Sequence, residues 1–231
     1  MNFLKDVNEI RNLQHKYGYY LDKCLYDEVV DLFAKDGKAY FLNGIYNGKE
    51  SVRRLMCGFF RNFFTRGHNG PHYGFLLDHL QLQDVIDVAP DRKTAKGRFR
   101  CLMQGGVHES RPDIPGFPAA LWEAGIYENE YVREDGVWKI GFYNYSMLWQ
   151  ADYRKGWSEG SAFLRPLTET FPHDPNGPDE LFAEPEKVWP DTRIVPFHYP
   201  HPVTGRHWEG DIHGARPWED DSDTGVHREA V

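Results

Sequence analysis

Several features that would reveal a function class directly are missing from this sequence of 231 residues. It has no run of about 18 apolar residues that would span a membrane, and the polar pattern directly after Met1 is not that of a signal peptide. We therefore expect a cytoplasmic protein with no membrane partner. The sequence has no Gly-x-Ser-x-Gly elbow for a serine nucleophile. Gly105-Gly106 is not followed by a helical pattern, so a phosphate-binding loop is not predicted.

Cysteines are few, and positive charges are outnumbered by negative ones. Cys24, Cys57 and Cys101 are widely spaced and lie in apolar runs, which favours reduced core thiols over a disulfide framework or a zinc site. Lys and Arg number 27 against 35 Asp and Glu, a formal net charge of −8. The negative excess lies in residues 151–231, because residues 1–150 are balanced. A chain without a basic surplus matches nucleic acid poorly, so we expect no nucleic-acid partner.

Aromatic residues, in contrast, are plentiful at 15%, which suits either a deep apolar cavity or ordinary packing. Apolar residues at spacings of three and four predict a helix over 5–23, a shorter one over 26–34 that stops at Asp36-Gly37, and a third over 49–66. A short hairpin of residues 38–42 and 44–48 is predicted between the second and third helices.

Two long β-rich runs, 77–89 and 94–104, are separated only by the turn Pro90-Asp-Arg-Lys93, so they must lie antiparallel and adjacent. At about 3.3 Å per residue this hairpin runs roughly 40 Å, too long to stay flat. Two further strands, 121–134 and 137–149, flank the turn signal Glu134-Asp-Gly136. This order predicts an α+β fold, with three N-terminal helices packed on a strongly curved, mostly antiparallel sheet.

Two segments read as irregular. The Pro/Gly segment 108–118 is expected to form a flap over a cavity mouth. Residues 151–231 hold 10 of the 15 prolines and 4 of the 7 tryptophans, with no period except a possible turn at 179–183. We expect a domain over 1–150 and a C-terminal extension over 151–231, an arm that wraps its own domain or a neighbouring subunit. The acidic cluster 219–223 suggests a mobile end.

Five segments fall in the order of one known superfamily. They are Leu32-Phe-Ala-Lys-Asp36, Gly44 to Gly48, Thr94-Ala-Lys-Gly-Arg98, Gly125-Ile-Tyr-Glu-Asn-Glu-Tyr131 and Asp135-Gly-Val-Trp-Lys-Ile140. Over residues 5–150 the chain resembles the NTF2-like superfamily, in its SnoaL-like branch. The resemblance implies a cone with a pocket in its mouth, a fold that hosts unrelated functions. Similar proteins include scytalone dehydratase, bile acid 7α-dehydratase, ketosteroid isomerase and limonene epoxide hydrolase, which imply a site without metal or organic cofactor.

The resemblance to the dehydratases implies three catalytic residues: Tyr17 and Asp22 near the end of the first helix and His79 on the first long strand. An imidazole suits proton transfer near neutral pH, and Asp22 would hold it in one tautomer. A carboxylate that some relatives place on the next strand is missing from Arg98 to Gln104. The structural alternatives are a hydrogen-bonded core histidine, a solvated helix end and a packed tyrosine.

A second set of residues is expected to bind the substrate: Tyr20, Tyr46, Arg98, Arg100, Trp122 and Tyr127. Arg98 and Arg100 share one strand face, where they bind a phenolate or carboxylate if that face lines the cone and are solvated if it is the outer face. The tail also holds four histidines and two acidic residues whose spacing matches no compact metal motif, so no metal site is predicted. They are His198, His201, His207, His213, Glu209 and Asp211.

These features together predict a cofactor-independent lyase. It would eliminate water from a hydroxylated aromatic compound through a quinone-methide-like intermediate. The resemblance implies a narrower form, because a subset of the superfamily performs such elimination with loss of formaldehyde on lignin-derived diarylpropanes. The alternatives are an isomerase or epoxide hydrolase that uses Asp22 as its base, and a non-catalytic small-molecule-binding protein with the tail as its interaction arm. An oligomer is expected, because a half-open curved sheet leaves one face to cover, and the resemblance implies a homodimer or homotrimer.

Overall fold

The computed structural model describes residues 2–111, 117–159, 163–184 and 186–213. The strands are β1 (Phe33–Phe41), β2 (Gly44–Asn47), β3 (Phe75–Val88), β4 (Thr94–Val107), β5 (Leu121–Glu134), β6 (Val137–Asp152) and β7 (Glu180–Leu181). The helices are α1 (Asn2–Asp22), α2 (Tyr26–Asp31), η2 (Trp157–Glu159) and one continuous stretch made of α3 (Lys49–Arg53), η1 (Arg54–Phe60) and α4 (Arg61–Thr65). No helix in these ranges is long and apolar enough to cross a membrane.

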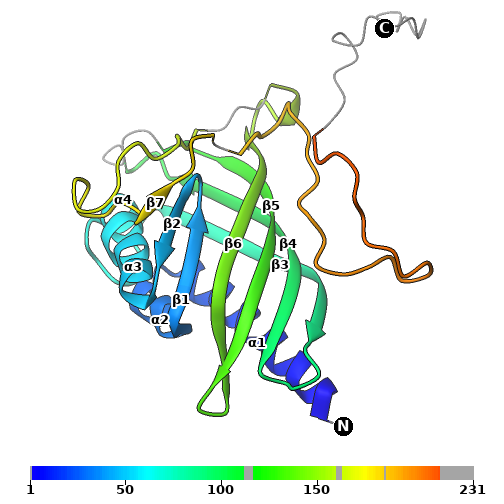
Figure 1. The fold of residues 1–231 in the computed structure, drawn as a ribbon. Coiled ribbons are helices and arrows are strands. Elements are labelled where there is room, and N and C mark those ends of the chain that lie inside the picture. The colour runs from blue at the N-terminus through cyan, green and yellow to red at the C-terminus, as the bar shows by residue number, and fades with distance from the viewer. Residues whose placement is uncertain (1, 112–116, 160–162, 185, 214–231) are drawn as a thin grey trace, which may run out of the picture.

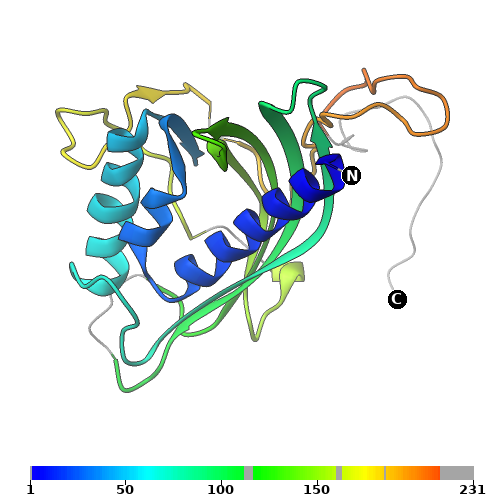
Figure 2. The same cartoon turned by 90° about the horizontal axis from the view of Figure 1, so that it is seen from below.

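All these strands form one sheet in the order β3-β4-β5-β6-β1-β2-β7 (Figure 1). Strands β3 to β6 run antiparallel to one another, and β1 joins β6 in parallel. The sheet curls around α1, which lies along its concave face (Figure 2), and it ends at β3 and β7 without closing. The predicted α+β fold with helices on a curved, mostly antiparallel sheet is confirmed.

Buried polar contacts fix α1 against the sheet. Asp6 is fully buried and accepts hydrogen bonds from Arg92 at the β3–β4 turn, from Arg133 at the end of β5 and from Trp138 in β6. About two turns further along α1, Gln14 donates to Gln81 of β3 at 2.8 Å. Because α1 is held at several points, the position of its C-terminal end against β3 is fixed.

The hairpin between β5 and β6 forms where the sequence predicts it. Asp135 and Gly136 have φ values of 50° and 80°. Positive φ at both central residues is the requirement of a two-residue turn whose twist suits the flanking strands, and glycine adopts it without steric cost.

The second helix is shorter than the sequence predicts and ends at Asp31. Phe33 already belongs to β1 and pairs with Ile140 of β6. Gly37 lies inside the strand at a register shift, where a Cβ would lie 2.9 Å from the carbonyl oxygen of Ile140. Asp36-Gly37 is therefore not a helix stop, and the glycine instead lets β1 pass close to β6.

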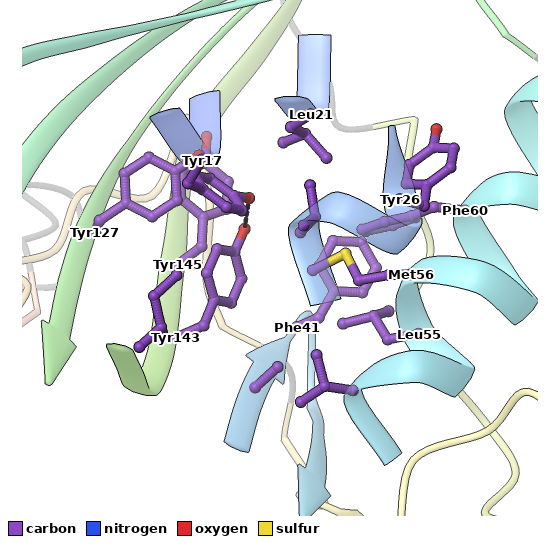
Figure 3. Packing of buried hydrophobic residues seen from close by; sticks show 14 of the residues in the cluster. Tyr17, Leu21, Tyr26, Phe41, Leu55, Met56, Phe60, Tyr127, Tyr143 and Tyr145 are labelled. Carbon is purple, nitrogen blue, oxygen red and sulfur yellow. Dashed lines mark hydrogen bonds between the residues drawn. The ribbon is translucent and has the colours of Figure 1, made fainter. Parts of the chain in front are cut away.

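The predicted third helix is continuous, but its middle section, η1, is wound as a π-helix. Leu55, Met56 and Phe60 from this section are buried in the core beside Phe41 (Figure 3). The opposite side approaches the C-terminal arm closely, since a Cβ on Gly58 would lie 2.2 Å from Asn176 Oδ1. A π-turn locally re-aims the side chains that follow it, which is one reason such turns occur near functional sites.

The C-terminal arm packs on its own chain. Residues 180–181 form β7 against β2, where the sequence predicts only a turn. Asn43, between β1 and β2, hydrogen-bonds the backbone of Leu167 and Phe182. Further along, Val195 lies against Arg98 on the convex face of β4. The acidic cluster 219–223 and residues 112–116 of the expected flap lie outside the described residues.

Candidate active site

The end of α1 brings Asp22 to His79 in β3. Asp22 Oδ1 lies 2.9 Å from His79 Nδ1 and also accepts the backbone N–H of His79 at 2.8 Å. The Asp22 and His79 side chains are only 8% and 10% exposed. Since a carboxylate only accepts, Nδ1 carries the proton of the bond. The other ring nitrogen, Nε2, is left available to a ligand.

This pairing explains an anomaly of the sequence. A carboxylate at a helix C-terminus is disfavoured by the helix dipole, and α1 has no basic residue in its last turn. Two hydrogen bonds from His79 stabilise Asp22 there instead. The sequence prediction that Asp22 and His79 lie together matches the geometry, whereas their catalytic roles stay a prediction.

Tyr17 is fully buried one turn before Asp22, inside a cluster of four tyrosines. Its hydroxyl donates to Tyr143 at 3.1 Å, as the dashed line in Figure 3 shows. Tyr127 and Tyr145 complete the cluster, with ring centroids 4.6 Å apart. Burial raises the pKa of all four phenols well above the ordinary value. They therefore stay neutral and act as hydrogen-bond donors.

Two cavities with largely apolar walls lie beside these residues. The smaller, of about 60 Å³, is lined by His79, Met103, Tyr127, Tyr143 and further apolar side chains. The larger, of about 220 Å³, lies between the mouth of the sheet and the arm, which contributes Leu164 to its wall. The cavities share four wall residues, which are Phe41, Glu123, Tyr145 and Leu164. His79 therefore faces a space that the C-terminal arm helps to enclose.

Glu123 of β5 is a site residue that the sequence prediction missed. Its side chain is 4% exposed and lines both cavities. Tyr145 donates to one carboxylate oxygen at 2.6 Å and Gln150 to the other at 2.5 Å. The sequence did contain a signal for it. Side chains at every second position of a strand share one face, and between Leu121 and Tyr127 the only charged residue on that face is Glu123.

The structure does not bring all the predicted substrate-binding residues to the cavities. Tyr127 lines the smaller one. Tyr20 packs at the edge of the core, and Trp122 stacks on Tyr153. Tyr46 is buried elsewhere and donates to the Asn176 carbonyl at 3.2 Å.

Arg98 and Arg100 lie on the convex face of β4, away from His79. Their neighbour Phe99 is buried on the concave face, and the side chains of a strand alternate. Arg98 is paired with Glu128 at 2.5 Å, and Arg100 borders a separate hollow under the arm. The sequence left open whether the strand face of Arg98 and Arg100 lines the cone. It is the outer face, and neither guanidinium contacts the two cavities.

The tail histidines are spread out. His198 pairs with Glu128, and His201 accepts backbone hydrogen bonds within its own turn. Within the ranges that the structure describes, no three His, Cys, Asp or Glu side chains come together as a metal site requires. The three cysteines are free thiols, as predicted, and burial raises the pKa of the Cys101 thiol to about 12.

Several solved structures share this fold. A candidate scytalone dehydratase from Novosphingobium aromaticivorans DSM 12444 superposes with a TM-score of 0.51 over 65% of this chain and 89% of its own, at 21% identity. LinA gives 0.52 over 71% of this chain and 96% of its own, at 18% identity. The hexachlorocyclohexane dehydrochlorinase LinA-type3 from Novosphingobium barchaimii LL02 gives 0.50 over 72% and 97%, at 17% identity. At such identities the likeness establishes the fold alone.

A comparison with curated protein sequences gives no match. The family model of the SnoaL-like domain matches residues 2–144, which hold β1 to β5 and the first half of β6, together with Asp22, His79 and Glu123. By this match over more than half of its length, the chain belongs to the SnoaL-like domain family of the NTF2-like fold.

Proposed function

We propose that this protein is a cofactor-independent lyase that eliminates water from a hydroxylated aromatic compound. The observation that carries the proposal is the pair of His79 and Asp22, joined at 2.9 Å, with the imidazole in the wall of a cavity. An imidazole held in one tautomer by a carboxylate is suited to move protons near neutral pH. The surrounding apolar walls exclude water, which strengthens each electrostatic interaction inside.

In the proposed reaction, protonated His79 donates its Nε2 proton to the benzylic hydroxyl of the substrate. The C–O bond then breaks, and its electron pair leaves with the oxygen as water. A para-hydroxyl group of the same ring loses its proton and supplies the electrons, which gives a quinone-methide-like intermediate. Neutral His79 next removes a proton from the neighbouring carbon, and the ring becomes aromatic again as its oxygen regains a proton. Asp22 stabilises the imidazolium at each stage.

The size of the cavities supports an aromatic substrate. A cavity of about 150 Å³ is known to hold one benzene ring, so a ring fits the larger space of about 220 Å³ but not the space of about 60 Å³ beside His79. We infer that the ring lies against the arm and that the reacting carbon points toward His79. Tyr127, Tyr143 and Tyr145, which line the smaller cavity, then lie beside the reacting end of the substrate, whereas Tyr17 lines neither cavity.

The finer form of the proposal is a lignin-derived diarylpropane as substrate. With a hydroxymethyl group next to the benzylic carbon, His79 takes the hydroxymethyl O–H proton in the second step. The adjoining C–C bond breaks, formaldehyde leaves, and the electron pair forms the new C=C bond. A second aryl group would extend from the larger cavity along the arm. The dehydratase and dehydrochlorinase activities that the solved structures are named for are eliminations, which supports catalysis of this general type.

The alternative of an isomerase or epoxide hydrolase with Asp22 as base has less support. Asp22 directs one oxygen at both the backbone and the ring of His79, so the imidazole rather than the carboxylate meets the cavity. Turnover in heavy-oxygen water separates epoxide hydrolysis from elimination, since hydrolysis incorporates the label and elimination does not.

A mass-spectrometric screen against hydroxylated monoaryl and diaryl compounds tests the proposal directly. We expect loss of water, or of water and formaldehyde together, from substrates with a para-phenol. The variant His79→Gln should lower kcat by about 10²- to 10⁴-fold, the usual contribution of a positioned acid or base. The control is His207→Gln, an exposed histidine of the arm. Normal turnover by His79→Gln would overturn the catalytic role of His79. An unchanged panel with retained ligand would overturn the lyase and leave a binding protein.

A further inference from the structure

We propose that Glu123 is the group that recognises the phenolic hydroxyl of the substrate and accepts its proton as the benzylic C–O bond breaks. This inference rests on the proposed function, whose first step sends a phenolic proton to an acceptor still to be named. Strand β4 lies between His79 and Glu123 in the sequence, and no motif connects the two residues. The pairing of the strands does.

His79, Met103 and Glu123 form one row across the sheet. His79 of β3 pairs with Met103 of β4, and Met103 pairs with Glu123 of β5. Neighbouring strands lie about 4.8 Å apart, so the Cα atoms of His79 and Glu123 are separated by roughly 10 Å. All three side chains line the smaller cavity, on the concave face of the sheet. His79 and Glu123, the two groups proposed to transfer protons, thus face the same cavity, with the thioether of Met103 between them.

Both oxygens of the Glu123 side chain accept hydrogen bonds. Both partners donate: the Tyr145 hydroxyl to Oε1 at 2.6 Å and the Gln150 amide to Oε2 at 2.5 Å. Burial, and then the charge of Glu123, raises the pKa of Tyr145, so that phenol does not give up its proton. A carboxylate has about four acceptor positions and these two donors occupy only two. Glu123 therefore keeps capacity for a hydrogen bond from a ligand.

The position of Glu123 relates it to the ring of the substrate. It lies in the wall that the two cavities share, whereas His79 lines only the smaller one. A ring in the larger cavity therefore meets Glu123 while its benzylic carbon is directed toward His79. The arm takes part in this arrangement, because Gln150 accepts the backbone N–H of Phe163 at 2.9 Å with its carbonyl and donates to Glu123 with its amide.

With Glu123 as acceptor, each proton of the proposed reaction has a donor and an acceptor within the site. The phenolic O–H bond breaks, its proton goes to Glu123, and its electron pair forms the carbonyl of the quinone-methide-like intermediate. The benzylic C–O pair leaves on oxygen, which is protonated by His79 and departs as water. In the second step the ring becomes aromatic, and its oxygen takes the proton back from Glu123. His79 is protonated again by the carbon or hydroxymethyl group that it deprotonates, so neither residue changes over one turnover.

The first experiment measures binding and needs no turnover. Its probes are a para-alkylphenol without a leaving group and the methyl ether of that phenol. Wild-type protein should prefer the phenol by about ten- to hundredfold, which is the value of a hydrogen bond to a charged acceptor. Glu123→Gln should largely abolish the preference. The matched control, Glu130→Gln, makes the same change on the exposed face of β5 and should keep it.

The second experiment measures turnover with phenols of decreasing pKa, obtained by fluorination of the ring. An acidic phenol arrives ionised and needs no acceptor, so the defect of Glu123→Gln should shrink along the series. Wild-type activity should fall along it, because the phenolate meets the charge of Glu123. A merely structural role of Glu123 would lower turnover equally for every phenol. His79→Gln should not be rescued by acidity, since its defect lies in the leaving group.

The outcomes separate this inference from the proposed function. Equal binding of phenol and methyl ether by the wild type overturns the role of Glu123, as does elimination from methyl ethers at the normal rate, which would leave the lyase in place. A phenol preference that depends on Glu123, together with no elimination from any substrate, overturns the lyase and retains Glu123 as the group that recognises phenols.

Discussion

One oxygen of Asp22 accepts two hydrogen bonds from a single residue, from the backbone N–H of His79 at 2.8 Å and from its ring Nδ1 at 2.9 Å. The carboxylate thus fixes the strand and the ring at the same time, so the direction of the imidazole depends on how the end of α1 sits on β3. A positioned base of this kind is sensitive to changes that leave the fold intact.

Asp22→Asn should separate activity from stability. An asparagine can offer a donor to Nδ1, which favours the wrong tautomer of His79, and we expect kcat to fall by about 10²- to 10⁴-fold with little change in KM. The melting temperature should change little, because a carboxylate at a helix C-terminus is itself unfavourable by about 0.3–1 kcal/mol. Steady-state kinetics and thermal unfolding test this against Asp31→Asn, an exposed carboxylate at the end of α2. A parallel loss of activity and stability would contradict it.

Gly125→Ala should disturb Glu123 indirectly, by displacing Tyr145. An added Cβ would lie 2.5 Å from the ring and hydroxyl of Tyr145, so Tyr145 must move from its position beside Glu123. Such overpacking costs about 1–3 kcal/mol, and we expect the phenol preference to fall as well. Removing only the hydroxyl, in Tyr145→Phe, isolates the hydrogen bond. If the two changes act through the same contact, the double variant should bind phenol no more weakly than the worse single variant.

The long elements could be predicted from the sequence because their own pattern decides them. The hairpin of β3 and β4 and the amphipathic α1 each extend over many residues, so periodicity outweighs local ambiguity. The predictions for short segments were wrong where a pairing partner decides the secondary structure. Phe33 joins a strand because Ile140 is there to pair with it, and residues 180–181 form β7 only because β2 offers a free edge.

The candidate site could be predicted only in part, because one of its residues is likewise placed by the pairing of strands. Asp22 and His79 follow from family position and from the anomaly of a carboxylate at a helix end. Glu123 does not, because its place beside His79 depends on the register of β3, β4 and β5, which includes an irregularity between Leu82 and Asp84. The predicted homodimer or homotrimer and the cytoplasmic location stay predictions.

Arg100→Ala tests the placement of the convex face. The sequence leaves open whether this arginine meets the substrate, and the structure places it in a hollow under the arm, away from His79. We therefore expect kcat/KM for the phenolic substrate to stay within about twofold of the wild type, as for an ordinary surface substitution. A loss of tenfold or more would show that the hollow takes part in substrate binding.

The buried Asp6 should make stability depend on pH in the acid range. Its hydrogen bond from Arg92, together with Trp138 and Arg133, holds the pKa of Asp6 well below its usual range. The unfolded value is about 3.9, so the stabilisation is fully present above about pH 4 and is lost as pH falls toward the folded value. Asp6→Asn should lower stability at pH 7 by about 2 kcal/mol, less than for a fully buried pair because both arginines are partly exposed.

Urea unfolding at several pH values checks the sign. The wild type should lose stability between about pH 4 and pH 2, and the gap between wild type and Asp6→Asn should narrow over the same range. Other carboxylates titrate in both proteins, so the difference between them is the informative quantity. A gap that widens on acidification would contradict the assignment.

Asn43 should control how firmly the arm closes the larger cavity. Its side chain donates to the carbonyls of Leu167 and Phe182 at 3.1 Å and 3.3 Å and accepts the Leu167 N–H at 2.8 Å. Asn43→Ala leaves these backbone groups without partners and should cost about 2–3 kcal/mol. Since Leu164 lines both cavities only three residues earlier, hydrogen exchange should rise around it and KM should increase more than kcat falls. Asn47→Ala, which removes an exposed contact to Glu180 from β2, should do neither. Equal effects of the two variants would mean that the arm is held by its apolar contacts rather than by Asn43.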